Sequence, residues 1–527
     1  MLRAFLPVGY RNLRTDAKNL VGLGRINLLV GPNNSGKSNY IRALGFLRDM
    51  LLCDGGSTSF LQTVEKHGRA EVVNRTHGSK TRTRRLAFQW LLQSVRQPSQ
   101  VESILKVQPS PRDLLYALSY VVGDSADFPM GFHVEIEELL EFAHAPIIDR
   151  RWSSARGKLL ARRGGRRADQ CEFGLVTHGK EPKPKLTPTL VVDVDTNETI
   201  LKQSAKLLKD KQFYEHVYPE FSKTQDELLA FARGFHSYAS TDLDVRQLAE
   251  GAKIDLSVRA LDAEGSQFVN VLRYLDQKYD FLDEYAERLR ELCPDLRKLK
   301  VIDASDTYKQ LELNIGGHKY KPREMSDGTL KAMWLALLLF SPEKGSVLSI
   351  DEPEMNLHPA WLKVIGRWLQ RFSSAEQLFV STHSPDLLDT FTEGFKTGEV
   401  ALFVFGLGDK EMRRVEPGEL ESFWKDGWEL GDLYRVGEPK LGDGRGKRRL
   451  LLHCGAHRNR RHPRLFAKAR PQGEVGALLS GGTQAGAEAT PSPSGSSQRA
   501  VGRKRSVSCR HHAGAFGQAL SRGGLLF

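Results

Sequence analysis

A short glycine-rich segment near the amino end carries the residues best suited to chemistry. Residues 31–38 read Gly-Pro-Asn-Asn-Ser-Gly-Lys-Ser, which fits the pattern G-x-x-x-x-G-K-[ST] of a phosphate-binding loop. Gly31 and Gly36 allow a tight turn around a phosphate chain, because a Cβ there would collide or strain the backbone. Lys37 is long enough to reach β- and γ-phosphates, and Ser38 has a hydroxyl that can bind Mg²⁺. The segment therefore predicts a site for ATP and Mg²⁺.

Two acidic residues and a histidine follow in the second half of the chain. Asp351 and Glu352 come directly after an apolar run at residues 346–350, which is typical of a strand that delivers carboxylates at its end. Beside a phosphate loop, Asp351 would bind Mg²⁺ and Glu352 would polarise the attacking water as a general base. His383 ends a later apolar run, where it would contact the γ-phosphate or that water.

A second candidate anion site opens the helix predicted at residues 332–340. Ser326 and Gly328 lie just before this helix, where a hydroxyl, free amide groups and the positive end of the helix dipole come together. The alternative is an ordinary helix N-cap with no ligand. These residues alone leave both interpretations open.

A parallel sheet with helices is the arrangement that would bring these segments together. Residues 25–30 are predicted to form a buried strand entering the phosphate loop, and residues 39–52 a helix leaving it with its N-terminus toward the phosphates. Ligands of such sheets lie at the carboxyl ends of the strands. The loop and the first turn of the helix supply the remaining expected nucleotide contacts, which are Asn33, Asn34, Ser35 and Asn39.

Taken together, these motifs resemble the ABC-type ATPase heads of the SMC/RecF superfamily. The resemblance rests on residues 31–38, 325–329, 350–354, 356–359 and 381–385. Within that superfamily the chain is most similar to stand-alone AAA-type (AAA15/AAA21) ATPases related to the OLD, overcoming-lysogenisation-defect, family. The implied fold class is α/β: a P-loop NTPase head of ABC/SMC type, with a mixed sheet flanked by helices.

The resemblance also implies an enzyme that hydrolyses ATP to ADP and phosphate. Two heads would bind ATP head to tail, with Ser326 and Gly328 of one copy completing the site of the other. ATP would then join a homodimer or a higher oligomer, and hydrolysis would release it. The implied catalytic residues are Lys37, Glu352 and His383, and the implied metal ligands are Ser38 and Asp351.

Three features depart from the wider superfamily. Asp327 stands where transporter ATPases carry a glycine. The glutamine that follows the phosphate loop in this superfamily has no firm equivalent, and Gln89 is the nearest candidate. The TOPRIM nuclease domain of OLD proteins is not found after His383, because no suitable strand carries its early Glu or its later Asp-x-Asp. We therefore expect a separate effector protein, with a nuclease as one option.

The net charge of +13 and the pI of about 9.4 would suggest a nucleic-acid partner. Residues 441–527, however, hold 16 Lys and Arg against 3 Asp and Glu, which accounts for the whole excess. The body of the protein is therefore not a generally basic surface. DNA remains a candidate partner at residues 150–167, which contain eight basic residues and no acidic one, although a solvated mobile loop is the alternative.

The compartment expected from the sequence is reducing and cytoplasmic. Five cysteines are scattered without paired spacing, which argues against a disulfide framework. The first residues lack the apolar run of a signal peptide, and the longest apolar run, residues 332–340, is too short to cross a membrane. We therefore expect no membrane partner.

Composition and motif positions predict four regions. An N-terminal lobe with the phosphate loop is followed by a largely helical insertion, a second lobe with the signature, acidic and histidine motifs, and a low-complexity basic tail. The tail cannot support a packed core and is expected to be disordered, with a gene-boundary artefact as the other explanation. The expected boundaries are 1–60, 61–234, 235–440 and 441–527.

Three functions remain open on these observations. The first is an ATPase that controls a nucleic-acid-directed system, such as phage defence or DNA repair, through an effector. The long separation of Lys37 from Ser326 favours it, because a partner-binding or DNA-binding subdomain would fit between them. A nucleotide-gated scaffold would not need Glu352 as a base. A transporter ATP-binding subunit would have a much shorter insertion and a Ser-Gly-Gly signature.

Overall fold

A computed structural model describes most of the first part of the chain. The chain separates into two units, Met1–Cys454 and Gly455–Phe527, and every described residue lies in the first. The tail expected at 441–527 lies outside the described residues. The described ranges are 1–13, 21–53, 57–68, 83–96, 110–125, 128–142, 158–164, 167–174, 189–195, 198–406 and 412–437.

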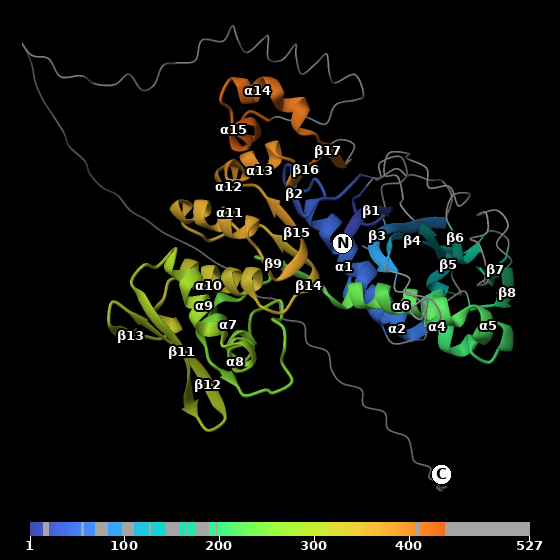
Figure 1. Ribbon diagram of the computed structural model, residues 1–527, viewed down its shortest axis with the longest axis horizontal. Coiled ribbons are helices and arrows are strands. Elements are labelled where there is room, and N and C mark those ends of the chain that lie inside the picture. The colour runs from blue at the N-terminus through green and yellow to red at the C-terminus, as the bar shows by residue number, and fades with distance from the viewer. Residues whose placement is uncertain are drawn as a thin grey trace, which may run out of the picture. The chain divides into compact units, whose positions relative to one another are not determined.

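A six-stranded sheet carries the segments predicted to do chemistry, and its strands can be followed in Figure 1. All neighbours pair in parallel except β17, which runs antiparallel to β16. Strands from the two halves of the chain therefore lie side by side, and the predicted mixed sheet is confirmed. The strand order is β17 (Met412–Val415), β16 (Val400–Phe405), β2 (Ile26–Val30), β15 (Ala375–Thr382), β14 (Gly345–Asp351) and β9 (Phe235–Ala239).

Both faces of this sheet are buried, and alternate residues of each strand enter different cores. On β2, Ile26 and Leu28 pack in one core, whereas Leu29 packs in the other. Since side chains alternate across a strand, a strand buried on both faces is apolar at nearly every position. The helices that contribute to the first core include α1 (Lys37–Leu52), α4 (Ile200–Leu207) and α6 (Tyr218–Arg233). Those that contribute to the second include α8 (Phe268–Tyr279), α9 (Phe281–Arg290), α10 (Asp327–Phe340) and α11 (Leu362–Gln370).

The prediction that the insertion at 61–234 is largely helical is wrong. The part of it that lies before residue 194 consists mainly of strands of one antiparallel sheet. Seven antiparallel strands form it in the order β1 (Leu2–Val8), β3 (Thr83–Arg96), β4 (Ser110–Ser125), β5 (Phe128–Phe142), β6 (Lys158–Gly164), β7 (Arg167–Gly174) and β8 (Thr189–Asp193). Leu86, Phe88 and Trp90 are buried at alternate positions of β3, which is the pattern of a half-buried strand. Phe5 of β1 pairs with Trp90, so the sheet crosses the boundary expected at residue 60.

Helices occupy most of residues 200–233, which end the insertion, and most of residues 268–290. Pro294 cannot donate a backbone hydrogen bond, and the chain then enters β11 (Leu296–Ser305). This strand belongs to a four-stranded antiparallel sheet with β10 (Ala252–Lys253), β12 (Tyr308–Ile315) and β13 (His318–Tyr320).

Short helices complete the described fold: α2 (Ser57–Lys66), α5 (Lys211–His216), α7 (Val245–Ala249), α12 (Pro385–Asp389), α13 (Thr392–Lys396), α14 (Glu421–Lys425) and α15 (Leu430–Arg435). Three 3₁₀ turns join them, η3 (Pro322–Glu324), η4 (Pro359–Trp361) and η5 (Pro417–Leu420). Within the described part of the chain, no helix has the length and apolar character needed to cross a membrane.

The basic stretch at 150–167 lies only partly within the described residues. In β6, Arg162 Nε lies 2.8 Å from Glu138 Oε1, and Arg163 Nη2 lies 2.9 Å from Glu137 Oε2. Both glutamates belong to the neighbouring strand β5. The described part of this stretch is therefore an ordered strand whose charge is balanced, rather than a mobile loop or an open basic surface.

Candidate ATP site

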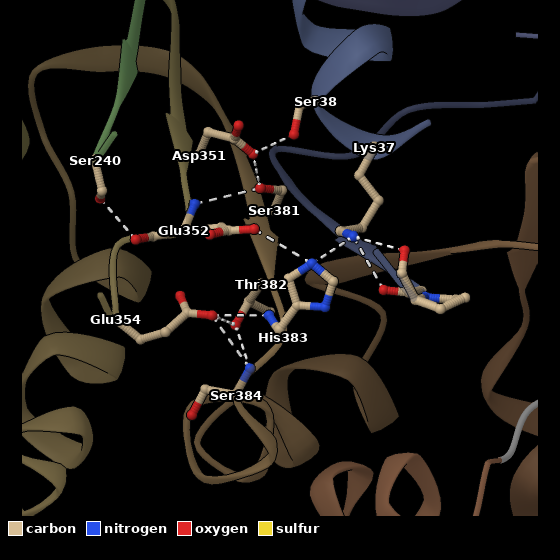
Figure 2. Close-up of polar contacts among 12 residues, drawn as sticks. Lys37, Ser38, Ser240, Asp351, Glu352, Glu354, Ser381, Thr382, His383 and Ser384 are labelled. Atoms are coloured by element: carbon tan, nitrogen blue, oxygen red, sulfur yellow. Dashed lines mark hydrogen bonds and ion pairs between the residues drawn. The ribbon is translucent and has the colours of Figure 1, made fainter. Parts of the chain in front are cut away.

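The predicted catalytic side chains converge at the carboxyl edge of the six-stranded sheet, as Figure 2 shows. Ser38 Oγ donates a hydrogen bond to Asp351 Oδ1 over 3.1 Å. Lys37 Nζ lies 2.7 Å from His383 Nε2, which in turn lies 3.2 Å from Glu352 Oε1. The phosphate loop follows β2, the two carboxylates lie at the end of β14, and the histidine follows β15, so three strands deliver one cluster.

The phosphate loop needs glycine at both positions of its pattern. Gly31 has a φ of 148° and Gly36 a φ of 113°, in the region that favours glycine. A Cβ on Gly31 would lie 2.5 Å from Phe405 O, and one on Gly36 would lie 2.9 Å from Leu13. Gly36 also caps α1 without a side-chain hydrogen bond, and the first turn of α1 holds no acidic residue. The helix N-terminus is thus electrostatically suited to a phosphate.

A cavity of about 560 Å³ lies over the loop, within the size range of small-molecule sites. Most of the expected loop contacts line it, but Gly31 and Ser35 do not, and neither does Asp351. Ser35 is instead buried, and its hydroxyl has no hydrogen-bond partner among the described residues. The lining residues are Asn12, Asn33, Asn34, Gly36, Lys37, Ser38, Asn39, Arg42, Glu352 and His383.

Asn12 and Arg42 are cavity residues that the motif did not include. Asn39 Nδ2 donates to Asn12 Oδ1 over 2.7 Å, and Asn12 Nδ2 donates to Asn34 O over 3.1 Å. Asn12 therefore braces the loop from the segment after β1. The loop motif could not reveal Asn12, because nothing in its spacing along the sequence connects it to the loop.

Lys37 is buried inside the loop that it serves, with only 4% of the residue exposed. Its Nζ donates to Gly31 O over 3.0 Å and to Pro32 O over 3.2 Å. Burial lowers the pKa of Lys37 to about 8, although Glu352 and Asp351 act in the opposite direction. A desolvated ammonium group at this point fits an incoming polyphosphate, whose charge would stabilise it.

Asp351 presents a carboxylate to two hydroxyl groups. Ser381, its direct neighbour in the parallel register, donates to the same Oδ1 that accepts from Ser38. Carboxylate and hydroxyl oxygens are the ligands that Mg²⁺ prefers. Ser38 and Asp351 therefore fit the predicted metal.

Glu352 is held in an unusual backbone conformation. Its φ of 52° is uncommon for a residue other than glycine, and such strain is typical of functional positions. Neighbours fix it: its N–H donates to Ser381 O over 3.0 Å, and its carbonyl accepts from Ser240 Oγ over 2.6 Å. Burial, together with the carboxylates of Asp351 and Glu354, raises the pKa of Glu352. This brings the carboxylate closer to the basicity that a general base needs.

Glu354 orders the turn that carries His383. Its Oε1 accepts from Thr382 Oγ1 over 2.7 Å, from His383 N over 2.8 Å and from Ser384 N over 3.2 Å. The sequence placed Glu354 in the acidic motif but predicted no contact for it. The bonds join two segments far apart in the chain, so local spacing could not reveal them.

Lys331 is a buried lysine of α10 that sequence reasoning also missed. Its Nζ donates to Ser240 Oγ over 2.8 Å and to Met355 O. Burial lowers the pKa of Lys331 to about 8. Because Ser240 in turn bonds Glu352, this lysine connects the helix of the signature segment to the acidic motif.

Ser326 and Gly328 are not brought to the phosphate loop of their own chain. Ser326 is exposed and caps α10, where its Oγ accepts from Thr329 N over 3.2 Å. Neither residue lines the described cavity. Gln89 does not line it either, and lies in β3 opposite Leu6. A role for Ser326 and Gly328 at the site of a second copy stays a prediction.

Comparison with known families agrees with this geometry. Residues 26–93 and 219–389 match the protein-family model described as AAA domain, putative AbiEii toxin, Type IV TA system. These two segments contain the phosphate loop, the acidic motif and His383. They are therefore similar in sequence to an AAA domain, and no curated protein matches the chain.

Several solved structures of SMC heads are distantly similar, each at 11% sequence identity. An SmcHead bound to the C-winged helix domain of ScpA has a TM-score of 0.34, covering 79% of this chain and 97% of that chain. The SMC head domain from Thermotoga maritima has a TM-score of 0.33, covering 79% and 98%. An Smc head domain with an extended coiled coil, bound to the C-terminal domain of ScpA derived from Pyrococcus furiosus, has a TM-score of 0.34, covering 81% and 98%. Similarity this distant says nothing about function.

Proposed function

We propose that this chain binds ATP with Mg²⁺ over its phosphate loop and hydrolyses it to ADP and phosphate. The observation that carries the proposal is the cluster of Lys37, Ser38, Asp351, Glu352 and His383 at one edge of one sheet. These five side chains provide a cation for phosphates, ligands for a metal, a base and a contact for the γ-phosphate. Few other reactions need all of them together.

Each residue has a distinct part in this reaction. Lys37 would exchange its bonds to the loop carbonyls for bonds to the β- and γ-phosphates. Ser38 and Asp351 would hold Mg²⁺, whose charge helps to neutralise the phosphates. Glu352 would take a proton from the attacking water, and His383, beside both Lys37 and Glu352, would contact the γ-phosphate.

ATP would also join two copies of the chain. Ser326 is exposed and does not line the cavity of its own chain, so a second copy is the natural source of this group at a bound γ-phosphate. ATP shifts the equilibrium toward the dimer only through contacts that the open state lacks. Hydrolysis would remove those contacts and release the dimer.

The wider role that we propose is control of a nucleic-acid-directed system, such as phage defence or DNA repair, through an effector protein. The description of the matched family as a putative toxin of a Type IV TA system supports a control function over a metabolic one. Direct DNA binding has less support, since Arg162 and Arg163 are paired with glutamates.

ATP turnover by the full chain tests the proposed activity. Lys37→Ala should abolish turnover, and Lys363→Ala, which removes an exposed lysine of α11, should leave it unchanged. Double-stranded DNA is added in a parallel series. Stimulation would support a DNA-sensing ATPase, and indifference would favour a protein as the regulated target. Equal turnover by wild type and Lys37→Ala would contradict the proposal.

A further inference from the structure

One hydroxyl group reaches the site from the far end of the described chain. Tyr434, in α15, donates from its hydroxyl to Gly31 O over 3.3 Å, and the same oxygen lies 3.3 Å from His383 Nδ1. A single side chain thus touches the first residue of the phosphate loop and the histidine after β15. Tyr434 lies outside the two segments that match the family, so no motif accounts for it.

The helix that carries Tyr434 is firmly docked on α12. Gly431 N donates to Asp389 Oδ1 over 2.6 Å, and a Cβ on Gly431 would overlap the α12 backbone. Arg435 Nη2 lies 2.5 Å from Asp386 Oδ1, and Leu433 is fully buried. Because these contacts flank Tyr434 on both sides, the position of its hydroxyl is determined by the fold.

Hydrogen-bond capacity assigns a proton within this contact. A phenol has one hydrogen, and if Tyr434 gives it to Gly31 O, its oxygen must accept from Nδ1–H of His383. Nε2 of the neutral ring is then an acceptor, which suits the ammonium of Lys37 at 2.7 Å. A proton on Nε2 could be donated to Glu352 Oε1 at 3.2 Å. It would, however, leave Nε2–H and the Lys37 ammonium, which are both donors, facing each other at 2.7 Å.

The neutral ring is consistent with the surroundings of His383. Burial, reinforced by the positive charge of Lys37, lowers the pKa of His383. One ring nitrogen therefore carries the single proton, and the group that bonds it decides which one. Tyr434 is the side chain recorded at Nδ1 among the described residues.

We propose that Tyr434 is a positioning residue that holds His383 against the phosphate loop and keeps the ring proton on Nδ1. The inference rests on the proposed ATP hydrolysis and adds the C-terminal helices to the site. His383 then meets the γ-phosphate region through Nε2 in a fixed orientation. Loss of the hydroxyl would free the ring to rotate and to change tautomer.

Single-turnover ATP hydrolysis by the full chain carrying Tyr434→Phe tests this role. We expect the rate constant to fall by about three- to tenfold, the effect of one lost hydrogen bond, with little change in ATP affinity or thermal midpoint. The control is Tyr308→Phe, which removes a hydroxyl that donates to Gly251 O over 2.7 Å in a different sheet. It should leave the rate unchanged.

A double variant separates positioning from general stability. If Tyr434 acts through His383, then Tyr434→Phe should have no further effect in a His383→Ala chain. Full additivity, or a Tyr434→Phe rate equal to that of wild type, would overturn the inference alone. A wild-type chain with no Lys37-dependent hydrolysis would instead contradict the proposed function and, with it, this role.

Discussion

Glu354 shows how one side chain without a predicted chemical role can fix the position of a proposed catalytic residue. Its Oε1 accepts three hydrogen bonds from the turn of Thr382, His383 and Ser384. Two of the donors are backbone N–H groups, and that of Ser384 also donates to Thr382 Oγ1 over 3.0 Å, whereas Glu354 is the acceptor of the His383 N–H among the described residues. The position of His383 therefore depends on an acidic residue in the turn after β14.

Replacing Glu354 should lower both stability and activity. Glu354→Ala removes the acceptor of the His383 N–H, at a cost of about 1–3 kcal/mol in the free energy of unfolding. Glu354→Gln keeps one acceptor oxygen and should recover part of that loss. Chemical denaturation and ATP turnover measure the two effects. Wild-type values for Glu354→Ala in both assays would show that the turn is held by other contacts.

Lys331 should make stability depend on pH. Its pKa in the folded chain is about 8, below its ordinary value of 10.5, so between these values the unfolded chain binds more protons. Stability then rises with pH, by about 2 kcal/mol between about pH 7 and about pH 9.5. In a Lys331→Met variant this contribution disappears. The free energy of unfolding, measured across that range, should therefore rise more steeply with pH in the wild type than in Lys331→Met. Parallel curves for the two chains would contradict the low pKa of Lys331.

The residues that sequence predicted at this site share one property, which is that a local pattern marks them. Lys37 and Ser38 belong to a fixed loop motif, and Asp351 and Glu352 end an apolar run. Tyr434 and the contacts of Glu354 are marked by nothing local, because they depend on how distant segments pack. Their partners lie in other strands or helices, so only the fold brings them together.

Among the elements, β2, β14 and β15 of the parallel sheet were predictable, whereas its strands β9 and β16 and the antiparallel sheets were not. β2, β14 and β15 each hold a short, mainly apolar segment, interrupted by Ser349 in β14, which is how strands buried on both faces appear. Strands β4, β5 and β6 carry buried charged residues, which mask the alternation that defines a strand. Glu137 of β5 and Arg163 of β6, for example, are both buried.

The buried pair of Glu137 and Arg163 should contribute strongly to the stability of the seven-stranded sheet. Their side chains are 1% and 0% exposed, and Glu137 Oε2 also accepts from Ile200 N at the start of α4. Arg163→Met leaves a buried carboxylate without its partner, which should cost about 3–5 kcal/mol. The added change Glu137→Gln removes that charge and should restore part of the loss.

The neighbouring pair in the same strands provides the control. Arg162 and Glu138 are 38% and 21% exposed, so Arg162→Met should cost no more than about 1 kcal/mol. Denaturant unfolding compares the two variants. Equal losses for Arg162→Met and Arg163→Met would mean that burial does not decide the strength of these pairs.

At the scale of the whole molecule, two groups of residues predicted to act on one ATP do not line the same cavity within one copy of the chain. Its phosphate loop, carboxylates and histidine form a cluster, whereas the exposed Ser326 at the start of α10 does not line the same cavity. Lys331 and Ser240 link that helix to Glu352 within one copy. A second copy would therefore complete the site. Its contact with α10 would be coupled to Glu352 through Lys331 and Ser240.

The most direct test of this account is the mass of a Glu352→Gln chain in solution with ATP and Mg²⁺. Without its base, the chain should retain unhydrolysed ATP and double in mass. Lys37→Ala should do neither, and Ser326→Arg should bind ATP without doubling, because the added side chain blocks the second copy. A Glu352→Gln chain that retains ATP at an unchanged mass would contradict ATP-driven dimerisation, and one that retains no ATP would contradict the site itself.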